Sequence, residues 1–188
     1  MTYEHPFAYE HIKFETEFEK ICKKNGLDIV DMSYHHLYPD HVKSKLRINT
    51  TPLSLLIRTT PDYICLNNGA YYELKTGRNP NQLNVEAYPL MCNQIRDKSL
   101  KIPCLYVYKG AITSHQIVVC NCLDIKAEYL VFPKDEKNDS IKDTLQDYFK
   151  CMCVQREKSK IWSNDAYVSI PAEQVQTWTP LSEYLKQA

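Results

Sequence analysis

The sequence lacks a net charge, has few glycines and contains no long apolar run. Its 23 Lys and Arg residues balance 23 Asp and Glu residues, and only 4 of its 188 residues are glycine. Without an overall positive field, any polyanion must be met by a local cluster of basic side chains. No Ser/Gly-rich linker divides the chain, whose length is that of one domain. We therefore expect a single domain over residues 1–188, with its core at about residues 10–110 and a C-terminal elaboration at 111–188.

Neither a membrane span nor a secretion signal is visible. The longest apolar stretches, such as residues 53–57, are far shorter than the roughly 20 residues that cross a bilayer. The N-terminus has no basic start followed by an apolar run. These absences predict a cytoplasmic protein. The eight cysteines are scattered in apolar runs, and the one-residue spacing within Cys120-x-Cys122 and Cys151-x-Cys153 favours free thiols over a structural zinc site.

Apolar periodicity predicts a mixed α/β fold. Phe14, Phe18 and Ile21 recur at helical steps, so a helix is expected over residues 10–24 that ends at Asn25-Gly26. Residues 81–98 also have helical spacing, although a proline within them should kink or divide the helix. A further helix is expected at 140–155 and a short one at 180–186. Strands are expected at residues 27–32, 53–59, 63–66, 70–75, 102–108, 115–122 and 166–170.

A hairpin signal brings three charged side chains together. Asn68-Gly69 is typical of a two-residue type I′ turn, because both central positions of that turn need a positive φ. With this turn Asp62 would pair with Lys75, and directly opposed residues share a face of the sheet. Glu73 and Lys75 lie on one side of their strand because side chains alternate. Asp62, Glu73 and Lys75 are therefore expected to converge.

These three side chains suit metal-assisted chemistry on a phosphate. Two carboxylates offer the hard oxygen ligands that Mg²⁺ and Mn²⁺ prefer. A metal bound by them polarises a phosphate oxygen and lowers the pKa of a bound water. Lys75 would position that water or offset charge on the phosphate. In the alternative interpretation, Asp62 caps a turn while Glu73 and Lys75 form an exposed charge row.

The motif resembles that of a known nuclease superfamily. Pro61-Asp62, ten intervening residues and Glu73-Leu74-Lys75 resemble the PD-(D/E)XK signature, and TTPDYICLNNGAYYELKTG is similar to viral replication-repair nucleases and Holliday-junction resolvases. The resemblance implies a restriction-endonuclease-like fold, in which helices flank a central mixed sheet. It also implies a Mg²⁺- or Mn²⁺-dependent DNA endonuclease of repair or recombination, of viral or mobile-element origin and located in the host cytoplasm if viral.

The same resemblance implies roles for individual residues. Asp62, Glu73 and the backbone carbonyl of Leu74 would hold the metal, and Lys75 would position the water. The superfamily also places an acid on its first helix. Glu17 lies at the edge of the apolar face of the first predicted helix, so we expect it to complete the acidic site.

Other helical positions stay open. On the first helix, Glu15 and Glu19 are expected to point further toward solvent. After the Glu-x-Lys strand, the superfamily carries a helix with a polar residue that faces the site, and the candidates here are Gln82, Glu86 and Tyr88. Gln82 and Glu86 are four residues apart, so they would share a helix face and both reach the site. The alternative is an ordinary solvated helix face.

Basic residues near the motif are candidates for contacts with DNA. From residue 41 to residue 60 there is no acid, and the basic residues in and after this stretch include Lys43, Lys45, Arg47, Arg58 and Arg78. Such side chains give salt-sensitive contacts with phosphates. We expect branched or single-stranded DNA to be bound in preference to plain duplex. Symmetric cutting of two strands would favour a two-fold dimer.

Two other functions fit parts of the sequence. The neutral total charge is compatible with a nucleic-acid-binding module that keeps the fold without catalysis. An exonuclease directed to single strands or ends is the other alternative, and some relatives of that kind hold an iron–sulfur cluster with cysteines. The absence of the usual two-residue Cys spacing argues against such a cluster here.

Overall fold

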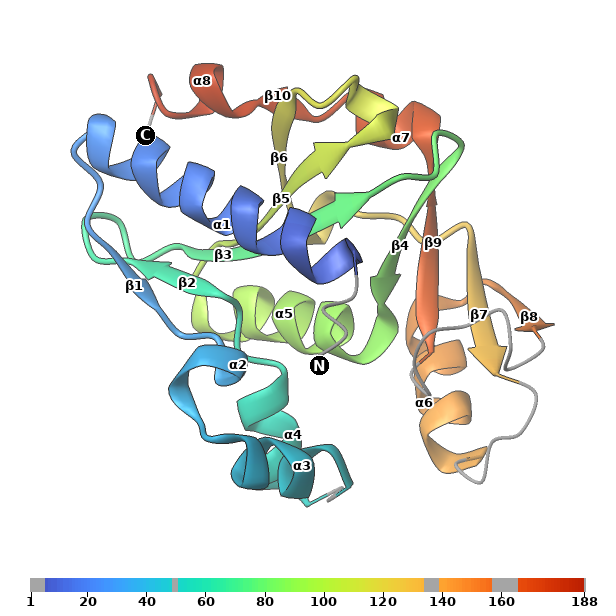
Figure 1. Ribbon diagram of the computed structural model, residues 1–188. Coiled ribbons are helices and arrows are strands. Elements are labelled where there is room, and N and C mark those ends of the chain that lie inside the picture. Colours follow the sequence, from blue (N-terminus) through green and yellow to red (C-terminus); the bar gives the residue numbers. More distant parts are fainter. Residues whose placement is uncertain (1–5, 49–50, 134–138, 157–165, 188) are drawn as a thin grey trace.

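The protein has a mixed α/β architecture in which helices flank a central sheet. The computed structural model describes residues 6–48, 51–133, 139–156 and 166–187 (Figure 1). The expected fold class is confirmed, since the central sheet is mixed and lies between helices. Over these ranges, none of the helices combines the length and apolar character of a membrane span.

Six strands form the central sheet. They are β1 (Ile29–Asp31), β2 (Tyr63–Cys65), β3 (Tyr71–Gly77), β5 (Cys104–Gly110), β6 (Ile117–Asn121) and β10 (Thr179–Pro180), in the order β1-β2-β3-β5-β6-β10. Strands β3 and β5 run parallel, and the other neighbouring pairs are antiparallel. Because β6 and β10 follow residue 110, part of the expected C-terminal elaboration completes the central sheet.

A second sheet stands beside the first. It contains β4 (Gln82–Glu86), β9 (Tyr167–Pro171), β7 (Tyr129–Pro133) and β8 (Met152–Arg156), in the order β4-β9-β7-β8. Helix α5 (Ala87–Leu100) follows β4 directly, and the core around it takes buried side chains from both sheets. These include Leu90, Tyr106, Tyr108, Val168 and Ile170. Of this sheet, only the strand at 166–170 was expected from the sequence.

Helix α1 (Pro6–Lys24) covers the opposite face of the central sheet. Its apolar residues Phe14, Phe18 and Cys22 are buried with Tyr72, Leu74 and other residues of the central strands. The Phe18 ring lies 5.6 Å from that of Tyr63 and 5.4 Å from that of Tyr72, between ring centroids. The helix stops at the expected Asn25-Gly26, where Gly26 adopts a φ of 71° that L side chains rarely tolerate.

Three short helices lie between β1 and β2. We call α2 (Tyr34–Leu37), α3 (Asp40–Ile48) and α4 (Pro52–Arg58) the helical lobe, and in Figure 1 they project below the central sheet. The expected strand at residues 53–59 is wrong, because this segment is α4. Pro52 opens the helix at a position where a missing N–H costs no hydrogen bond. Ser54 Oγ then donates to the Leu46 carbonyl at 2.8 Å, which joins α4 to α3.

Two other expected helices have different bounds. Residues 82–86 are strand β4, and α5 begins only at Ala87, so Pro89 falls in the first turn, where no N–H is required. Near the C-terminus, α6 (Asp139–Phe149) ends before Lys150, whose φ is 51°, and β8 follows. The remaining elements are the helices α7 (Ala172–Gln176) and α8 (Leu181–Tyr184) and the 3-10 turns η1 (Ala111–Thr113) and η2 (Cys122–Asp124).

We expect Phe18→Ala to lower the free energy of unfolding by about 3–5 kcal/mol, because it empties a fully buried ring site between α1 and the sheet. Urea denaturation followed by circular dichroism measures the change. Tyr9→Ala on the same helix is the matched control. Its side chain is 65% exposed, so it should change stability by no more than about 0.5 kcal/mol. Equal losses for the two variants would contradict this packing.

Candidate active site

The hairpin of β2 and β3 places Asp62 beside Glu73, although its turn differs from the expected one. Ile64 pairs with Tyr71, so the register is shifted by two residues and the next positions bring Asp62 opposite Glu73. The loop spans residues 66–69, and within it only Gly69 has a positive φ, of 70°. The type I′ turn is therefore wrong. A shift of two preserves the side-chain alternation, and the expected shared face is retained.

Lys75 is the centre of the cluster. Its Nζ lies 2.7 Å from Oε1 of Glu73 and 2.9 Å from Oε2 of Glu86. Glu73 is 9% exposed. Glu86 ends β4 and precedes α5, so the ammonium group joins the central sheet to the second sheet. Glu73, Lys75 and Glu86, three of the sequence-predicted site residues, are thus in contact. Glu86 lies at the end of a strand and not on the expected helix.

Asp62 is fixed by the backbone of the neighbouring strand. Its Oδ2 accepts a hydrogen bond from the Leu74 N–H at 2.7 Å, and its own carbonyl accepts one from the Met32 N–H at 2.7 Å. Within a strand, the N–H and C=O of one residue point toward the same edge. The Leu74 carbonyl therefore also points to the side of β3 on which Asp62 lies.

The charges in this cluster perturb one another. Burial raises the pKa of Asp62 well above its ordinary value, and the negative charge of Glu73 raises it further. Burial also raises the pKa of Glu73, against the opposing effect of Lys75. For Lys75, burial acts to lower the pKa, but the carboxylates, led by Glu73 and Glu86, raise it well above its ordinary value. Lys75 is thus a firmly protonated cation.

Glu86 differs from the other two carboxylates. Burial opposes its ionisation, yet the charge and hydrogen bond of Lys75 leave its pKa below the ordinary value. Its side chain is committed to Lys75 and makes no capping hydrogen bond to α5. Ionisation is therefore favoured at Glu86, whereas it is disfavoured at Asp62 by burial and the charge of Glu73, and at Glu73 by burial and the charge of Glu86.

Glu15 is the buried acid of α1, contrary to the expectation that it points toward solvent. It is 7% exposed, and its charge contributes to the raised pKa of Asp62. Its Oε1 lies 3.3 Å from Nε2 of His11, and its Oε2 lies 3.8 Å from Nε2 of His36. The His11 pKa falls to about 4, chiefly through burial and then through the charge of Lys75. The i,i+4 spacing of His11 and Glu15 was the available sequence signal.

Glu17 lies elsewhere on α1. Its carboxylate pairs with the Lys109 ammonium of β5. In the β3–β5 register, Glu73 is beside Tyr106 and Lys75 is beside Tyr108, so Lys109 projects from the other face of the sheet. The expectation that Glu17 joins Asp62 and Glu73 is therefore not met by its position. The apolar periodicity of α1 did not distinguish which helix edge faces the site.

Gln82 is also held away from the cluster. It lies at the start of β4, where its Oε1 accepts a hydrogen bond from the Tyr129 hydroxyl at 2.6 Å and its Nε2 donates to Asn84 at 3.2 Å. The expected helix face shared by Gln82 and Glu86 does not exist, because both residues belong to a strand. Only Glu86, at the end of that strand, reaches Lys75.

The basic residues predicted to bind DNA differ in exposure and in their ion pairs. Lys45 is exposed on α3. Lys43 is partly buried, at 2.6 Å from Asp40 and 3.2 Å from the His35 carbonyl. Arg78 forms a bidentate pair with Glu10 at 2.8 and 3.0 Å. Arg47 and Arg58 lie on α3 and α4. Their roles in binding DNA remain predictions.

The oxygen atoms around Asp62 and Glu73 fit a divalent cation. Mg²⁺ keeps several waters and is commonly bound through one or two carboxylates, and carbonyl oxygens are also suitable ligands. In the described part of the chain, no hydrogen bond or ion pair engages Oδ1 of Asp62 or Oε2 of Glu73. No group of three or more His, Cys, Asp or Glu side chains there is already gathered around one point. If a cation binds here, Asp62, Glu73 and the Leu74 carbonyl would be its protein ligands.

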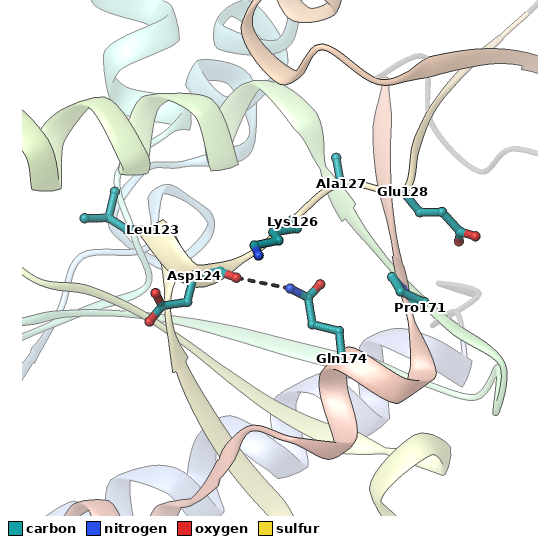
Figure 2. Close-up of a pocket in the computed structure, with 7 residues that line it drawn as sticks. All are labelled: Leu123, Asp124, Lys126, Ala127, Glu128, Pro171 and Gln174. Carbon is teal, nitrogen blue, oxygen red and sulfur yellow. Dashed lines mark hydrogen bonds between the residues drawn. The ribbon is translucent and has the colours of Figure 1, made fainter.

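A surface pocket lies apart from this cluster. Figure 2 shows it between the η2 turn and the start of α7, with the Gln174 amide donating to the Asp124 carbonyl at 3.1 Å. Its lining residues are Leu123, Asp124, Lys126, Ala127, Glu128, Pro171 and Gln174. It shares no residue with the acidic cluster, so the chemistry described here does not involve it.

All eight cysteines are free thiols, as expected. Cys104 and Cys122 are buried neighbours, and Cys122 Sγ lies 3.9 Å from Oδ2 of Asp97. A hydrogen bond from Cys122 lowers the pKa of Cys104, whereas the same contact and burial raise that of Cys122. These thiols belong to the core around α5.

Together the fold and the cluster define a mixed α/β protein with a partly buried acidic cluster on one face of its central sheet. No family model and no curated protein matches the chain. Among solved structures, it is similar to Hjc, a Holliday junction resolvase from the archaeal hyperthermophile Archaeoglobus fulgidus. The identity is 8% and the TM-score 0.48, over 94% of this chain and 96% of that chain.

We expect Asp62→Asn to gain stability relative to the wild type as the pH rises. A carboxyl group whose pKa is raised by folding contributes nothing below its unfolded pKa, and it destabilises the fold increasingly as the pH rises toward its folded pKa. Asparagine can still accept the Leu74 N–H but carries no charge. Urea denaturation from about pH 4 to pH 8, without divalent ions, measures the difference. A difference that stays constant with pH would contradict the raised pKa.

Proposed function

We propose that this protein is a Mg²⁺- or Mn²⁺-dependent DNA endonuclease that acts on branched or single-stranded DNA. The observation that carries the proposal is the convergence of Asp62 and Glu73, both with raised pKa values, beside the Leu74 carbonyl and a protonated lysine. Carboxylates whose ionisation is disfavoured by burial and by neighbouring acids gain from a bound dication. The spacing of these residues is also the one that resembles the PD-(D/E)XK signature.

Each residue of the cluster has its own role in this proposal. Asp62, Glu73 and the Leu74 carbonyl would hold the metal, which supplies a Lewis acid and an activated water when bound. Lys75, which is paired with Glu73 and Glu86, would orient the water or offset charge on the phosphate. Glu86 holds the Lys75 ammonium in place. Glu15, rather than Glu17, completes the acidic site from α1.

The wider assignment rests on the resemblance of the sequence to the PD-(D/E)XK superfamily. A role in DNA repair or recombination, a viral or mobile-element origin and a cytoplasmic location are part of this proposal. Cleavage of two strands at a symmetric junction would favour a two-fold dimer. The alternative function, a DNA-binding module without catalysis, predicts that no Mn²⁺ binds at millimolar concentration in calorimetry.

We expect Lys75→Met to reduce the rate of DNA cleavage by at least about 100-fold. The substitution removes the cation that would offset the negative charge developing on the phosphate in the transition state. Binding of the same DNA, measured in Ca²⁺ without cleavage, should change by less than about threefold. Lys24→Met is the matched control, since this exposed lysine lies at the far end of α1. Cleavage by Lys75→Met at the wild-type rate would refute the assignment.

A second comparison distinguishes Glu15 from Glu17, two of the acids of α1. We expect Glu15→Gln to lower the cleavage rate by about tenfold or more, because Glu15 contributes to the electrostatics of Asp62. Glu17→Gln should have a smaller effect, since Glu17 pairs with Lys109 on the other face of the sheet. Single-turnover rates at several Mg²⁺ concentrations provide the measurement. A larger loss of cleavage rate in Glu17→Gln than in Glu15→Gln would show that Glu17, not Glu15, belongs to the site.

A further inference from the structure

The helical lobe exposes apolar side chains that the fold does not use. On α4, Leu53 is 67% exposed and Leu56 is 57% exposed, and their spacing of three residues places them on one helix face. Leu37 of α2 is 53% exposed. Single exposed leucines are common, but neighbouring ones on a short helix form a small apolar surface.

The charge of the lobe identifies the kind of partner. No acid occurs between residues 41 and 60, and Asp40, the one acid of the three helices, is paired with Lys43. Lys45 is exposed on α3, which packs against α4 through the Ser54–Leu46 hydrogen bond. Helix α4 is only about 10 Å long, which is less than the width of a DNA major groove, about 12 Å. A nucleic acid that touches Leu53 would therefore also lie near α3.

Both ends of the lobe are fixed beside the acidic cluster. At its start, His36 Nδ1 lies 2.6 Å from Oδ2 of Asp31, and its Nε2 faces Glu15. At its end, the Thr59 carbonyl accepts a hydrogen bond from Arg96 at 3.3 Å, and Asp62 follows three residues later. The lobe is thus anchored to the rest of the fold near Glu15 at its start and near Asp62 at its end.

We propose that the helical lobe recognises interruptions in base pairing. Leu53 and Leu56 would contact unpaired or unstacked bases, as apolar wedges do in proteins that open base steps, while Lys45 contacts phosphates. A continuous duplex presents stacked pairs and a charged backbone, and it offers little to these leucines. This inference rests on the proposed function, because it treats the partner of the lobe as the DNA that the acidic site cuts.

Binding of a four-way junction and of a duplex of the same sequence tests the proposal. Fluorescence anisotropy in Ca²⁺ measures both affinities without cleavage. The variant Leu53→Ser/Leu56→Ser should weaken junction binding about tenfold and change duplex binding by less than about twofold. Leu66→Ser is the matched control, since Leu66 is 65% exposed in the β2–β3 loop, at the other end of β2 from Asp62. Circular dichroism confirms that each variant is folded.

Salt dependence tests the basic part of the surface. Lys45→Ala should weaken binding of both DNAs and reduce the slope of log affinity against log salt by about one. Lys24→Ala should leave that slope unchanged. Vesicles that contain anionic lipid serve as a competing partner, and the leucine variant should not alter their binding.

Three outcomes would overturn the role of the lobe: equal losses on junction and duplex, no loss relative to Leu66→Ser, or a loss of vesicle binding alone. The nuclease proposal fails separately. If the wild type binds junctions through the leucines but does not cut DNA with Mg²⁺ or Mn²⁺, recognition stands and catalysis is refuted. If the wild type cuts DNA and the leucine variant binds and cuts junctions normally, catalysis stands and the role of the lobe is refuted.

Discussion

The ammonium group of Lys75 between Glu73 and Glu86 is the interaction on which the site depends. Glu73 belongs to the central sheet, whereas Glu86 ends a strand of the second sheet and precedes α5. A buried charge is costly unless it is paired. The pairing therefore fixes the position at which the two sheets and the helix between them meet. Asp62 is held beside this cluster because its carboxylate accepts a hydrogen bond from the Leu74 N–H.

The same constraint leaves the cluster with excess negative charge. One lysine cannot balance the carboxylates around it, and the raised pKa values of Asp62 and Glu73 express that imbalance. Helix α1 adds Glu15, which is flanked by His11 and His36 rather than by a permanently charged cation. The zero net charge is therefore a sum over unlike regions: an acidic cluster at Asp62, Glu73 and Glu86, and a helical lobe whose one acid, Asp40, is paired with Lys43.

Several features of the fold follow from local sequence. The apolar spacing of α1 and its Asn-Gly stop, the strands β2 and β3, and the free thiols were predicted correctly. The convergence of Asp62, Glu73 and Lys75 was also predicted, although the hairpin register was wrong by two residues. The error left the predicted shared face of these residues unchanged, because side chains in a strand alternate with a period of two. The segments 53–59 and 82–86 were misassigned, since short apolar runs do not distinguish strand from helix.

The sequence by itself determined which residues share a strand face, because that depends only on alternation along neighbouring segments. Only the tertiary structure decided which distant residues join them. Glu86 reaches Lys75 because β4 pairs with β9, some 80 residues later, and its end turns back toward the central sheet. Glu15 contributes to the raised pKa of Asp62, whereas Glu17 pairs with Lys109, because of how α1 is rotated on the sheet. The packing of Phe14 and Phe18 sets that rotation, and local periodicity leaves both helix edges available.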